Sequence, residues 1–326
     1  MKNPPEIAVI GAGMTGLTCA RRLRDAGLSV TVFDKGRGLG GRLATRRYGD
    51  DLAFDHGAQF VKARSPAFQA ALGFAVDTGQ AGPWIPVHDP KPDVHSSEMI
   101  VGVPGMNGLV KPMASDLRFH LKTQVTALDR LKEGWRLTAI DRAIDTSFSH
   151  VVSTVPAPQA RAFMVLDPDL AALLDPVDIA PCWAMMIAFN KPIFPEADLV
   201  RPDRGPIAWL ARNGSKPGRP DASDCWVAHA SPDWSRTHLE EDPSAIAPRL
   251  VEAVAEILEM PLPDPIHVSA HRWRYAMTLR PLGRPYLAND DRTLLVGGDW
   301  CLGARVESAF DSGAAIADAL IAEIGP

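Results

Sequence analysis

A glycine-rich turn between an apolar strand and a helix constrains the fold of this chain more than any other feature. Residues 7–10 predict a short buried strand, and Gly11, Gly13 and Gly16 follow it at the spacing Gly-x-Gly-x-x-Gly. In a βαβ unit the first glycine permits a tight turn, the second lets backbone approach a pyrophosphate, and the third lets the helix pack on the strand. The spacing therefore predicts a dinucleotide site.

The next segments complete the same unit. The sequence predicts a helix over residues 14–26, a stop at Gly27 and a second strand over residues 30–33 that leads directly to Asp34. The helix N-terminus directs amide groups and a positive dipole end at phosphates, and the Asp34 carboxylate can accept hydrogen bonds from ribose hydroxyls. A glycine turn in an unrelated βαβ unit is the alternative, and the ordered series of signals argues against it.

Size and charge narrow the class of protein. The chain has 326 residues, enough for two domains, and 46% of them are hydrophobic. The net charge of −5 argues against nucleic acid as the main partner. Basic residues nevertheless cluster at positions 42–47 and 212–219, where they could bind a small polyanion or simply form solvated loops.

The cysteines and the hydropathy predict a cytoplasmic protein that does not bind membranes. The sequence leaves open whether the protein is a monomer or a homodimer. Cys19, Cys182, Cys225 and Cys301 form no Cys-x-x-Cys pair, so we expect reduced thiols. No apolar run approaches the roughly 18 residues of a membrane span, and no charged-then-apolar leader precedes the first strand. The sequence shows no cluster of residues with metal-ligand spacing, so no metal is predicted.

Further glycine-containing segments predict more of the cofactor site. Residues 36–42 (Gly-Arg-Gly-Leu-Gly-Gly-Arg) follow the acid of the second strand, and the arginine at their end could pair with a diphosphate. Residues 55–59 form a glycine-containing turn. Near the C-terminus a predicted strand ends at residues 298–299, and a helix starts near residue 306, where its amides could face developing negative charge. The first and last segments therefore look like parts of one nucleotide domain that a second domain interrupts.

Five motifs, taken in their order, resemble the FAD-dependent amine oxidase superfamily. They are GAGMTGL, VFDKGRGLGGR, DHGAQF, VVSTVPAPQ and VGGDW. Four later segments are similar to the renalases within that superfamily, especially to their bacterial members: residues 209–219, 229–236, 270–276 and 298–309. The resemblance covers essentially the whole chain.

The resemblance implies an α/β fold of the p-hydroxybenzoate hydroxylase and amine oxidase type, with non-covalent FAD in a Rossmann-like domain. The FAD domain would comprise residues 1–75, 100–158 and 270–326, and a mixed-sheet substrate domain would comprise residues 76–99 and 159–269. The implied reaction is oxidation of 1,2- or 1,6-dihydro-NAD(P), isomers that carry the hydride at the wrong ring carbon, by transfer to flavin N5. Dioxygen would then reoxidise the flavin, giving NAD(P)⁺ and hydrogen peroxide.

Matching the motifs residue by residue assigns the cofactor contacts. The predicted FAD-binding residues are Gly11, Gly13, Met14, Thr15, Gly16, Asp34, Lys35, Gly40, Gly41, Arg42, Gly57, Ala58, Gln59, Val125, Thr154, Gly298, Asp299, Arg305, Val306, Glu307 and Ala309. Cys301 lies near the last motif, but its local sequence differs from that of the cysteine-linked flavoproteins in the superfamily.

An aromatic strand with interleaved arginines is the predicted substrate platform. Alternation places His271, Trp273 and Tyr275 on one face and Arg272 and Arg274 on the other. The predicted catalytic residues are Trp273, Arg274 and Tyr275, which would orient the dihydronicotinamide ring. The predicted substrate residues are Arg212, Lys216 and His271, with Arg219 as a further candidate. Core aromatics and a solvated basic loop are the structural alternatives.

Two other functions remain open at this stage. The first is an FAD-dependent amine oxidase or desaturase that acts on a hydrophobic substrate. Amine oxidases usually place a lysine near flavin N5 and an aromatic residue after the last Gly-Asp pair, whereas no lysine follows Lys216 here and Arg305 takes the aromatic position. The second is a non-catalytic flavin-binding protein that responds to redox state.

Overall fold

The computed structural model describes residues 6–87, 99–193 and 197–325, and these form two compact units. Unit 1 contains residues 6–41, 110–179 and 278–325, and unit 2 contains residues 42–87, 99–109, 180–193 and 197–277.

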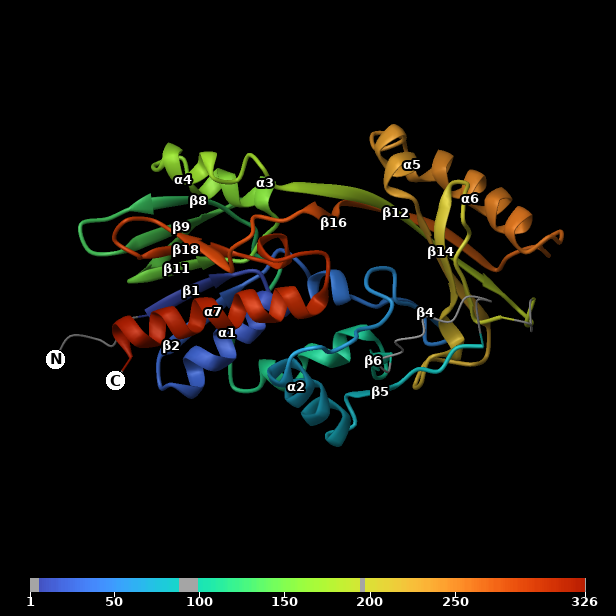
Figure 1. Cartoon of the computed structure of the whole chain (residues 1–326), viewed down its shortest axis with the longest axis horizontal. Coiled ribbons are helices and arrows are strands. Elements are labelled where there is room, and N and C mark those ends of the chain that lie inside the picture. The colour runs from blue at the N-terminus through green and yellow to red at the C-terminus, as the bar shows by residue number, and fades with distance from the viewer. Residues whose placement is uncertain (1–5, 88–98, 194–196, 326) are drawn as a thin grey trace. The chain divides into compact units, whose positions relative to one another are not determined.

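Unit 1 is built on a six-stranded sheet with the order β17-β18-β11-β1-β2-β7 (Figure 1). Its strands are β1 (Glu6–Ile10), β2 (Ser29–Phe33), β7 (Arg118–His120), β11 (His150–Ser153), β17 (Tyr286–Ala288) and β18 (Leu294–Gly297). All neighbours run parallel except β17 and β18. Strands β1, β11 and β18 are buried along nearly their whole length, as expected for a parallel sheet covered on both faces.

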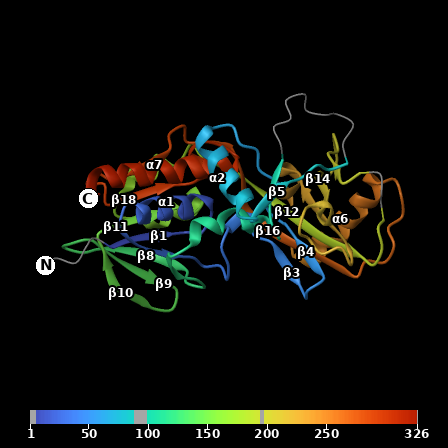
Figure 2. The same cartoon turned by 90° about the horizontal axis from the view of Figure 1, so that it is seen from below.

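Two layers cover this sheet. Helices α1 (Met14–Asp25) and α7 (Val306–Ile324) pack against each other on one face, and a three-stranded meander lies on the other (Figure 2). The meander consists of the antiparallel strands β8 (Val125–Arg130), β9 (Trp135–Ala139) and β10 (Ala143–Phe148). Helices α3 (Ala157–Ala160) and α4 (Pro168–Ala172) share its core, where Phe33, Leu137 and Leu170 are buried together.

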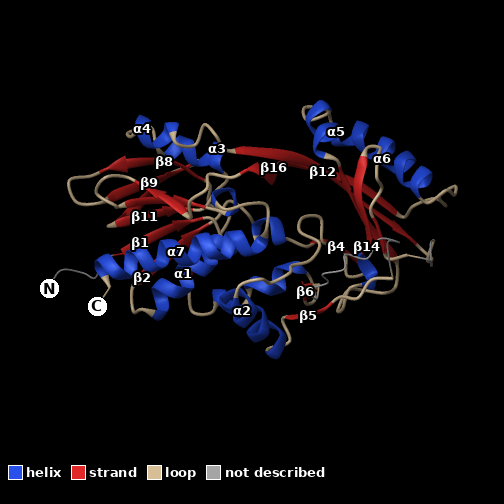
Figure 3. Ribbon diagram, viewed as in Figure 1, coloured by secondary structure: helices blue, strands red, loops and turns tan. Residues whose placement is uncertain are grey.

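Unit 2 is built on a second sheet, with the order β13-β14-β15-β12-β16. Its strands are β12 (Asp178–Phe189), β13 (Leu199–Val200), β14 (Ile207–Arg212), β15 (Asp224–Ala230) and β16 (His267–Arg280). The pairs β13–β14, β14–β15 and β15–β12 are antiparallel. The long strands β12 and β16, labelled in Figure 3, contribute residues to both units by the division given above.

Alternate side chains of β12 enter two different cores. Met185 and Ile187 pack with α6 (Pro243–Ile257), whereas Met186 and Ala188 pack with the hairpin of β3 (Arg46–Tyr48) and β4 (Leu52–Phe54). Successive side chains of a strand point to opposite faces, so one apolar strand supplies both cores. The remaining elements of unit 2 are α2 (Pro66–Asp77), α5 (Pro232–Thr237) and the paired strands β5 (Ala81–Pro83) and β6 (Ile100–Gly102).

The structure confirms the predicted α/β class with a Rossmann-like nucleotide unit. The strand predicted over residues 30–33 is β2, and the helix predicted to start near residue 306 is α7. Among the described residues, no helix combines the length and the apolarity that a membrane crossing requires.

The two units divide the chain differently from the predicted domains. Residues 42–75, 100–109 and 270–277 belong to unit 2, and residues 159–179 belong to unit 1. The first difference arises because Phe54 packs on the β12–β15 sheet. The last arises because the residues around α4 complete the core under the meander. Long-range packing of this kind leaves no local mark in the sequence.

Candidate functional site

The three glycines of the first turn serve three different needs. Gly11 has a φ of +113°, and a Cβ there would lie 2.4 Å from Thr154 Oγ1. A Cβ on Gly16 would lie 1.9 Å from the Gly11 carbonyl oxygen, so strand and helix touch through these residues. A Cβ on Gly13 would meet nothing closer than the Gly40 carbonyl oxygen, at 3.9 Å, and its φ of −84° suits any residue. A side chain at Gly13 would therefore meet open space beside the glycine turn, where a pyrophosphate would fit.

Gly40 and Gly41 form a second wall of the same turn. The Gly40 N–H donates to the Ala12 carbonyl at 2.8 Å, and Gly40 forms a parallel bridge with Gly13. Gly40 and Gly41 have φ values of +111° and +55°, which favour glycine. Two glycine-rich segments that are distant in sequence thus present backbone, not side chains, to the same space.

The Asp34 carboxylate is held by backbone amides at the end of β2. Its Oδ2 accepts from the Ala12 N–H and its Oδ1 from the Gly36 N–H, both at 2.6 Å. Each carboxylate oxygen has a second lone pair, so ribose hydroxyls can still bind there. The turn and the acid are therefore one hydrogen-bonded unit, as a dinucleotide site requires.

The C-terminal cofactor motif lies where α7 starts. Arg305 precedes the helix, and its Nη1 lies 3.2 Å from the carboxylate of Glu307, which is 2% exposed. A Cβ on Gly313 would lie 2.3 Å from the Thr15 carbonyl oxygen, so α7 packs directly on the first turn of α1. This contact brings Val306 and the following turn of α7 into the same unit as the glycine turn.

Other predicted cofactor residues of unit 1 have different surroundings. Asp299, at the end of β18, accepts from Thr278 Oγ1 at 3.1 Å and follows Gly298. Thr154 Oγ1 donates to the Ile10 carbonyl at 2.9 Å. Three more, Met14, Val125 and Ala309, are buried, and Lys35 is exposed. The Val125 side chain belongs to the core beside Phe33.

The remaining predicted cofactor residues belong to unit 2. Arg42 donates from Nη1 to the Ala276 carbonyl at 3.0 Å, and its own carbonyl accepts from the Ala58 N–H at 2.8 Å. A Cβ on Gly57 would lie 2.0 Å from the Arg42 carbonyl oxygen. Arg42 therefore fixes the turn that contains Gly57, Ala58 and Gln59, and its pairing with a diphosphate stays a prediction.

Asp55, which begins this turn, is the centre of a buried charge cluster. Its Oδ2 lies 3.2 Å from Lys216 Nζ and 2.5 Å from an Arg219 guanidinium nitrogen, and all three side chains are 0% exposed. Thr45 Oγ1 and the Met106 N–H donate to Oδ1 at 2.6 and 3.0 Å. The cluster thus buries two cations against one carboxylate.

Lys216 makes further contacts that use all its protons. Its Nζ donates to Gln59 Oε1 at 3.0 Å and Asn213 Oδ1 at 3.3 Å, and it lies 5.2 Å from the centre of the Trp84 ring. Burial lowers the pKa of Lys216 to about 8, against the opposing effect of Asp55. Burial alone would raise the pKa of Asp55, but Lys216 and Arg219 outweigh it and hold that pKa well below its ordinary value.

An aromatic group lies next along the chain. The His56 ring stacks on Trp273 at 4.9 Å between ring centres with 29° between planes, and His271 meets Trp273 edge-on at 4.5 Å. The His56 carbonyl accepts from Trp273 Nε1 at 2.8 Å and from His229 Nε2 at 3.2 Å. We call His56, His229, His271 and Trp273 the histidine–tryptophan group.

Its three histidines are neutral near pH 7. Burial is the largest cause for each of them, lowering the pKa of His56 to about 3 and the pKa values of His229 and His271 to about 4. The group therefore presents flat, uncharged surfaces.

The two faces of β16 separate the predicted catalytic residues. Trp273 and His271 share the aromatic face, as alternation predicts. Arg274 lies on the other side, exposed and paired with Glu240 at 2.5 Å, and Arg272 reaches the same carboxylate at 3.5 Å. The structure thus groups Trp273 with His271 and does not group Arg274 with either; Tyr275 follows Arg274 on the strand and is partly buried.

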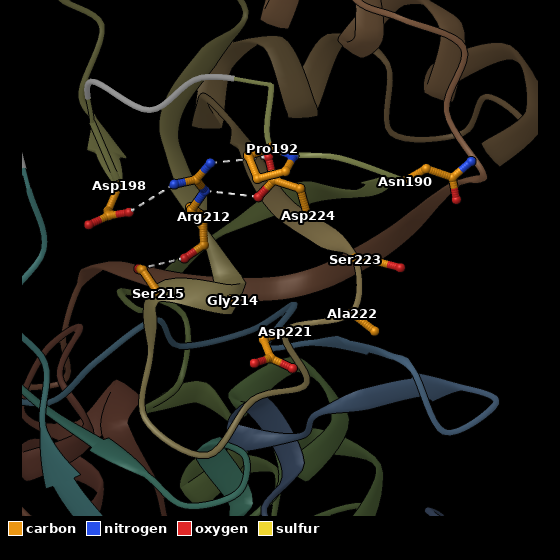
Figure 4. Close-up of a pocket in the computed structure, with 10 residues that line it drawn as sticks. All are labelled: Asn190, Pro192, Asp198, Arg212, Gly214, Ser215, Asp221, Ala222, Ser223 and Asp224. Atoms are coloured by element: carbon orange, nitrogen blue, oxygen red, sulfur yellow. Dashed lines mark hydrogen bonds and ion pairs between the residues drawn. The ribbon is translucent and has the colours of Figure 1, made fainter.

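The described conformation does not offer Arg212 or Lys216 to a substrate phosphate. Arg212 Nε lies 2.8 Å from an Asp224 oxygen, and Arg212 Nη1 lies 3.7 Å from Asp198, beside a pocket of about 260 Å³ (Figure 4). Lys216 and Arg219 are bound to Asp55 out of contact with solvent. In the described structure the positive charges of Arg212, Lys216 and Arg219 are paired inside the unit, and their contact with a substrate phosphate stays a prediction.

Several functional candidates were missed by sequence reasoning. Asp55 and His56 stand in the quoted motif DHGAQF, and His229 stands in residues 229–236. The structure alone brings Asp55 to Lys216 and Arg219, and brings His56 and His229 to the group of Trp273. Arg46, bonded to His271, gave no signal of its own. No group of three or more His, Cys, Asp or Glu side chains is arranged to hold a metal within the part of the chain that the structure describes.

The four thiols are buried or nearly so. Cys19, Cys225 and Cys301 are at most 2% exposed, and Cys182 is partly exposed as a residue. Burial raises the pKa of Cys225 to about 11 and the pKa values of Cys182 and Cys301 to about 12, and it raises that of Cys19 further. These groups are thiols, not thiolates, at neutral pH.

The sheet, the glycine cradle and the Asp34 carboxylate together define a dinucleotide-binding α/β protein. Two family patterns match the chain: residues 9–73 match an NAD(P)-binding Rossmann-like domain, and residues 91–321 match the flavin containing amine oxidoreductases. The second match covers well over half of the chain, so the protein belongs to the flavin-containing amine oxidoreductase family. It is an oxidoreductase with FAD as its cofactor, and the open space at Gly13 and the acid at the end of β2 fit that cofactor.

Solved structures of similar fold span nearly the whole chain. A putative protoporphyrinogen oxidase from Exiguobacterium sp. 255-15 has a TM-score of 0.78 at 13% identity, covering 98% of this chain and 99% of its own. Cyclohexylamine oxidase from Brevibacterium oxydans IH-35A has a TM-score of 0.77 at 13% identity, covering 99% and 100%. At this identity the likeness concerns the fold alone.

Sequence similarity to a curated relative is confined to a short segment. A 4,4'-diapophytoene desaturase from Staphylococcus aureus (strain Newman) is 45% identical over 56 residues. That segment is 17% of this chain and 11% of the desaturase, so the chain matches about a tenth of the relative's length.

Proposed function

We propose that this protein is an FAD-dependent oxidase of 1,2- or 1,6-dihydro-NAD(P). The observation that carries the proposal is the histidine–tryptophan group, in which His56 stacks on Trp273 and every titratable ring is neutral. A dihydropyridine ring is flat and uncharged, so it can stack on such a surface. Trp273 and His271 are the residues that we expect to hold and orient it.

The reaction needs no general base from the protein. Loss of a hydride converts a dihydronicotinamide into an aromatic cation, so no proton has to be removed. Bound FAD would supply the hydride acceptor and the electron transfer to dioxygen, so that the dihydro-NAD(P) isomer, O2 and H⁺ would give NAD(P)⁺ and H2O2. The neutral state of His56 and His271 serves the same end, because a charged histidine would repel the developing pyridinium.

The surroundings of Lys216 also support the proposal over amine oxidation. It is the last lysine of the chain, and its amine is bound by Asp55, Gln59 and Asn213. Arg305, at the position that the resemblance gives to an aromatic residue in amine oxidases, is exposed and paired with Glu307. The resemblance of residues 209–219 and 270–276 to the renalases points the same way.

An amine oxidase or desaturase is the second candidate, and one observation favours it. Burial lowers the pKa of Lys216 to about 8, so an appreciable part of this amine is neutral at slightly alkaline pH. A neutral lysine could act as a base if its contact with Asp55 opened. The family match is equally consistent with this chemistry.

Anaerobic mixing decides between these functions. Purified holoprotein is mixed with 1,2-dihydro-NAD(P), 1,6-dihydro-NAD(P), benzylamine or putrescine while the flavin absorbance is followed. We expect at least one dihydro isomer to bleach the flavin quickly and the amines to leave it oxidised. Faster bleaching by either amine would overturn the proposal. Readmitted air should restore the absorbance with release of H2O2 in each turnover, which a non-catalytic flavin protein would not do.

We also propose that FAD is bound without a covalent link, at one per chain. Cys301 is fully buried and carries a raised pKa of about 12, so its thiolate is not available for addition to a flavin. Acid precipitation should release the flavin to the supernatant. Flavin that stays in the pellet of the parent but not of Cys301→Ala would show a link through this residue. The cytoplasmic location and the oligomeric state stay predictions.

A further inference from the structure

One contact within unit 2 determines which nitrogen of His271 carries its proton. Arg46, on β3, places a guanidinium nitrogen 3.3 Å from His271 Nδ1, on β16. A guanidinium can donate hydrogen bonds but cannot accept them, and it stays protonated in proteins. His271 Nδ1 must therefore be the acceptor. Because the ring is neutral, its single proton is on Nε2.

The other neighbours of His271 keep this arrangement in place. The His56 ring meets it edge-on at 4.9 Å, and Trp273 does so at 4.5 Å. The charged or titratable groups that face it are Arg46 from β3 and His56 from the segment after β4. Burial, and then the charge of Arg46, lower the pKa of His271 to about 4. The same charge also lowers the pKa of His56.

We infer that Arg46 is a positioning residue that fixes His271 as an Nε2–H donor for a carbonyl oxygen on the substrate ring. The inference rests on the proposed function, in which that oxygen belongs to the carboxamide of a dihydronicotinamide. A fixed donor beside the aromatic face of Trp273 orients a ring that stacking alone would leave free to rotate in its plane. In this arrangement His271 donates to the substrate, and Arg46 acts on the substrate only through His271.

The arrangement also keeps the positive charge of Arg46 out of contact with the substrate ring. The product ring carries a positive charge, so a protonated His271 in contact with it would oppose hydride loss. Burial, with a smaller contribution from Arg46, opposes protonation of His271, and the charge of Arg46 lies at the Nδ1 side, across the imidazole from the donating Nε2. Arg46 therefore sets the orientation of His271 and adds to its neutrality without contacting the substrate.

Nuclear magnetic resonance tests the tautomer without reference to activity. Holoprotein labelled with ¹⁵N-histidine is titrated from pH 5 to pH 8, and the His271 signals are assigned by their loss in His271→Gln. We expect the Nε2–H tautomer in the parent, with no titration above about pH 5. In Arg46→Met we expect a mixture of tautomers and a rise of the pKa toward its ordinary value of 6.5. An Nδ1–H tautomer in the parent would overturn the inference.

Rapid kinetics test the consequence for binding. The anaerobic reduction of FAD by the dihydro isomer is measured for Arg46→Met, Arg46→Lys and the control Arg47→Gln, whose residue is exposed on the same strand. Losing one oriented hydrogen bond should weaken substrate binding about two- to tenfold in Arg46→Met. The loss should be largest below pH 6.5. Arg46→Lys keeps a hydrogen-bond donor and should recover most of the lost affinity. Arg47→Gln should match the parent.

Together, the resonance and kinetic experiments distinguish failure of the inference from failure of the proposed function. Unchanged binding in Arg46→Met, with an altered tautomer, would show that His271 does not donate to the substrate. If the parent is reduced by neither isomer, the proposed function fails, while the resonance experiment still decides the bond between Arg46 and His271. If Arg46→Met loses its FAD or does not fold, the tautomer of the parent and the kinetics of Arg46→Lys carry the decision.

Discussion

The nucleotide site of unit 1 and the polar interior of unit 2 are built in opposite ways. The site in unit 1 consists largely of backbone, with Gly13 and Gly40 keeping space open and Asp34 held by two amides. The interior of unit 2 consists of side chains, with Asp55 binding two buried cations. A backbone site depends on where side chains are absent, and a side-chain cluster depends on every partner being present. The two regions should therefore fail differently when mutated.

The largest effect should follow from filling the space at Gly13. Because the backbone of Gly13 suits any residue and its surroundings are open, Gly13→Val should fold but lose FAD completely. Gly16→Val should instead fail to fold, since a Cβ there would lie 1.9 Å from a carbonyl oxygen. Flavin content and circular dichroism of both variants check this. A yellow Gly13→Val protein would contradict the assignment of the pyrophosphate site.

The next largest effect should come from Asp55. Asp55→Asn leaves Lys216 and Arg219 buried without their counter-charge, which should reduce the free energy of unfolding by about 3–5 kcal/mol. Asp51→Asn, an exposed change just before β4, is the matched control and should have little effect. Urea unfolding of the two holoproteins, followed by tryptophan fluorescence, measures the difference. Equal midpoints would mean that the cluster does not stabilise unit 2.

Lys216 should make the stability of unit 2 rise with pH in the alkaline range. Its pKa is about 8 in the folded protein against an ordinary 10.5, so the unfolded chain binds the extra proton between these values. Stability should therefore rise with pH from about 8 to 10.5, by about 3 kcal/mol relative to Lys216→Met. The measurement is urea unfolding of both proteins at several pH values. A constant difference between them would show that the folded-state pKa is not lowered.

The smallest effects should separate the two faces of β16. Trp273→Leu removes the stacking surface and should slow anaerobic flavin reduction about two- to tenfold while FAD stays bound. Arg274→Ala breaks only an exposed pair with Glu240 and should leave the reductive rate unchanged. Both Trp273 and Arg274 are predicted catalytic residues, and only Trp273 lies on the aromatic face of β16. If Arg274→Ala lowers the rate of flavin reduction and Trp273→Leu does not, the substrate contacts the face of β16 that carries Arg274.

The same difference between the two regions explains which contacts could be predicted from the sequence. Gly11, Gly13, Gly16 and Asp34 lie within one βαβ unit, where spacing alone predicts geometry, and the structure keeps them together. Asp55 and Lys216 are 161 positions apart and meet only because two strands of unit 2 bring them together. No local pattern distinguishes a lysine that is buried against a carboxylate from one in a solvated loop. For the same reason the sequence cannot show that Arg212 and Lys216 are paired with Asp224 and Asp55.

The buried cysteines have a consequence for the proposed reaction, in which dioxygen is reduced to hydrogen peroxide. Peroxide oxidises cysteine through its thiolate, and the first product, a sulfenic acid, can pass to irreversible acids. With pKa values of about 11 to 12, Cys182, Cys225 and Cys301 hold almost no thiolate at neutral pH. Packing around these side chains would thus also protect the protein from the peroxide that the proposed reaction releases. Its working life under turnover would then be limited by other residues, such as exposed methionines.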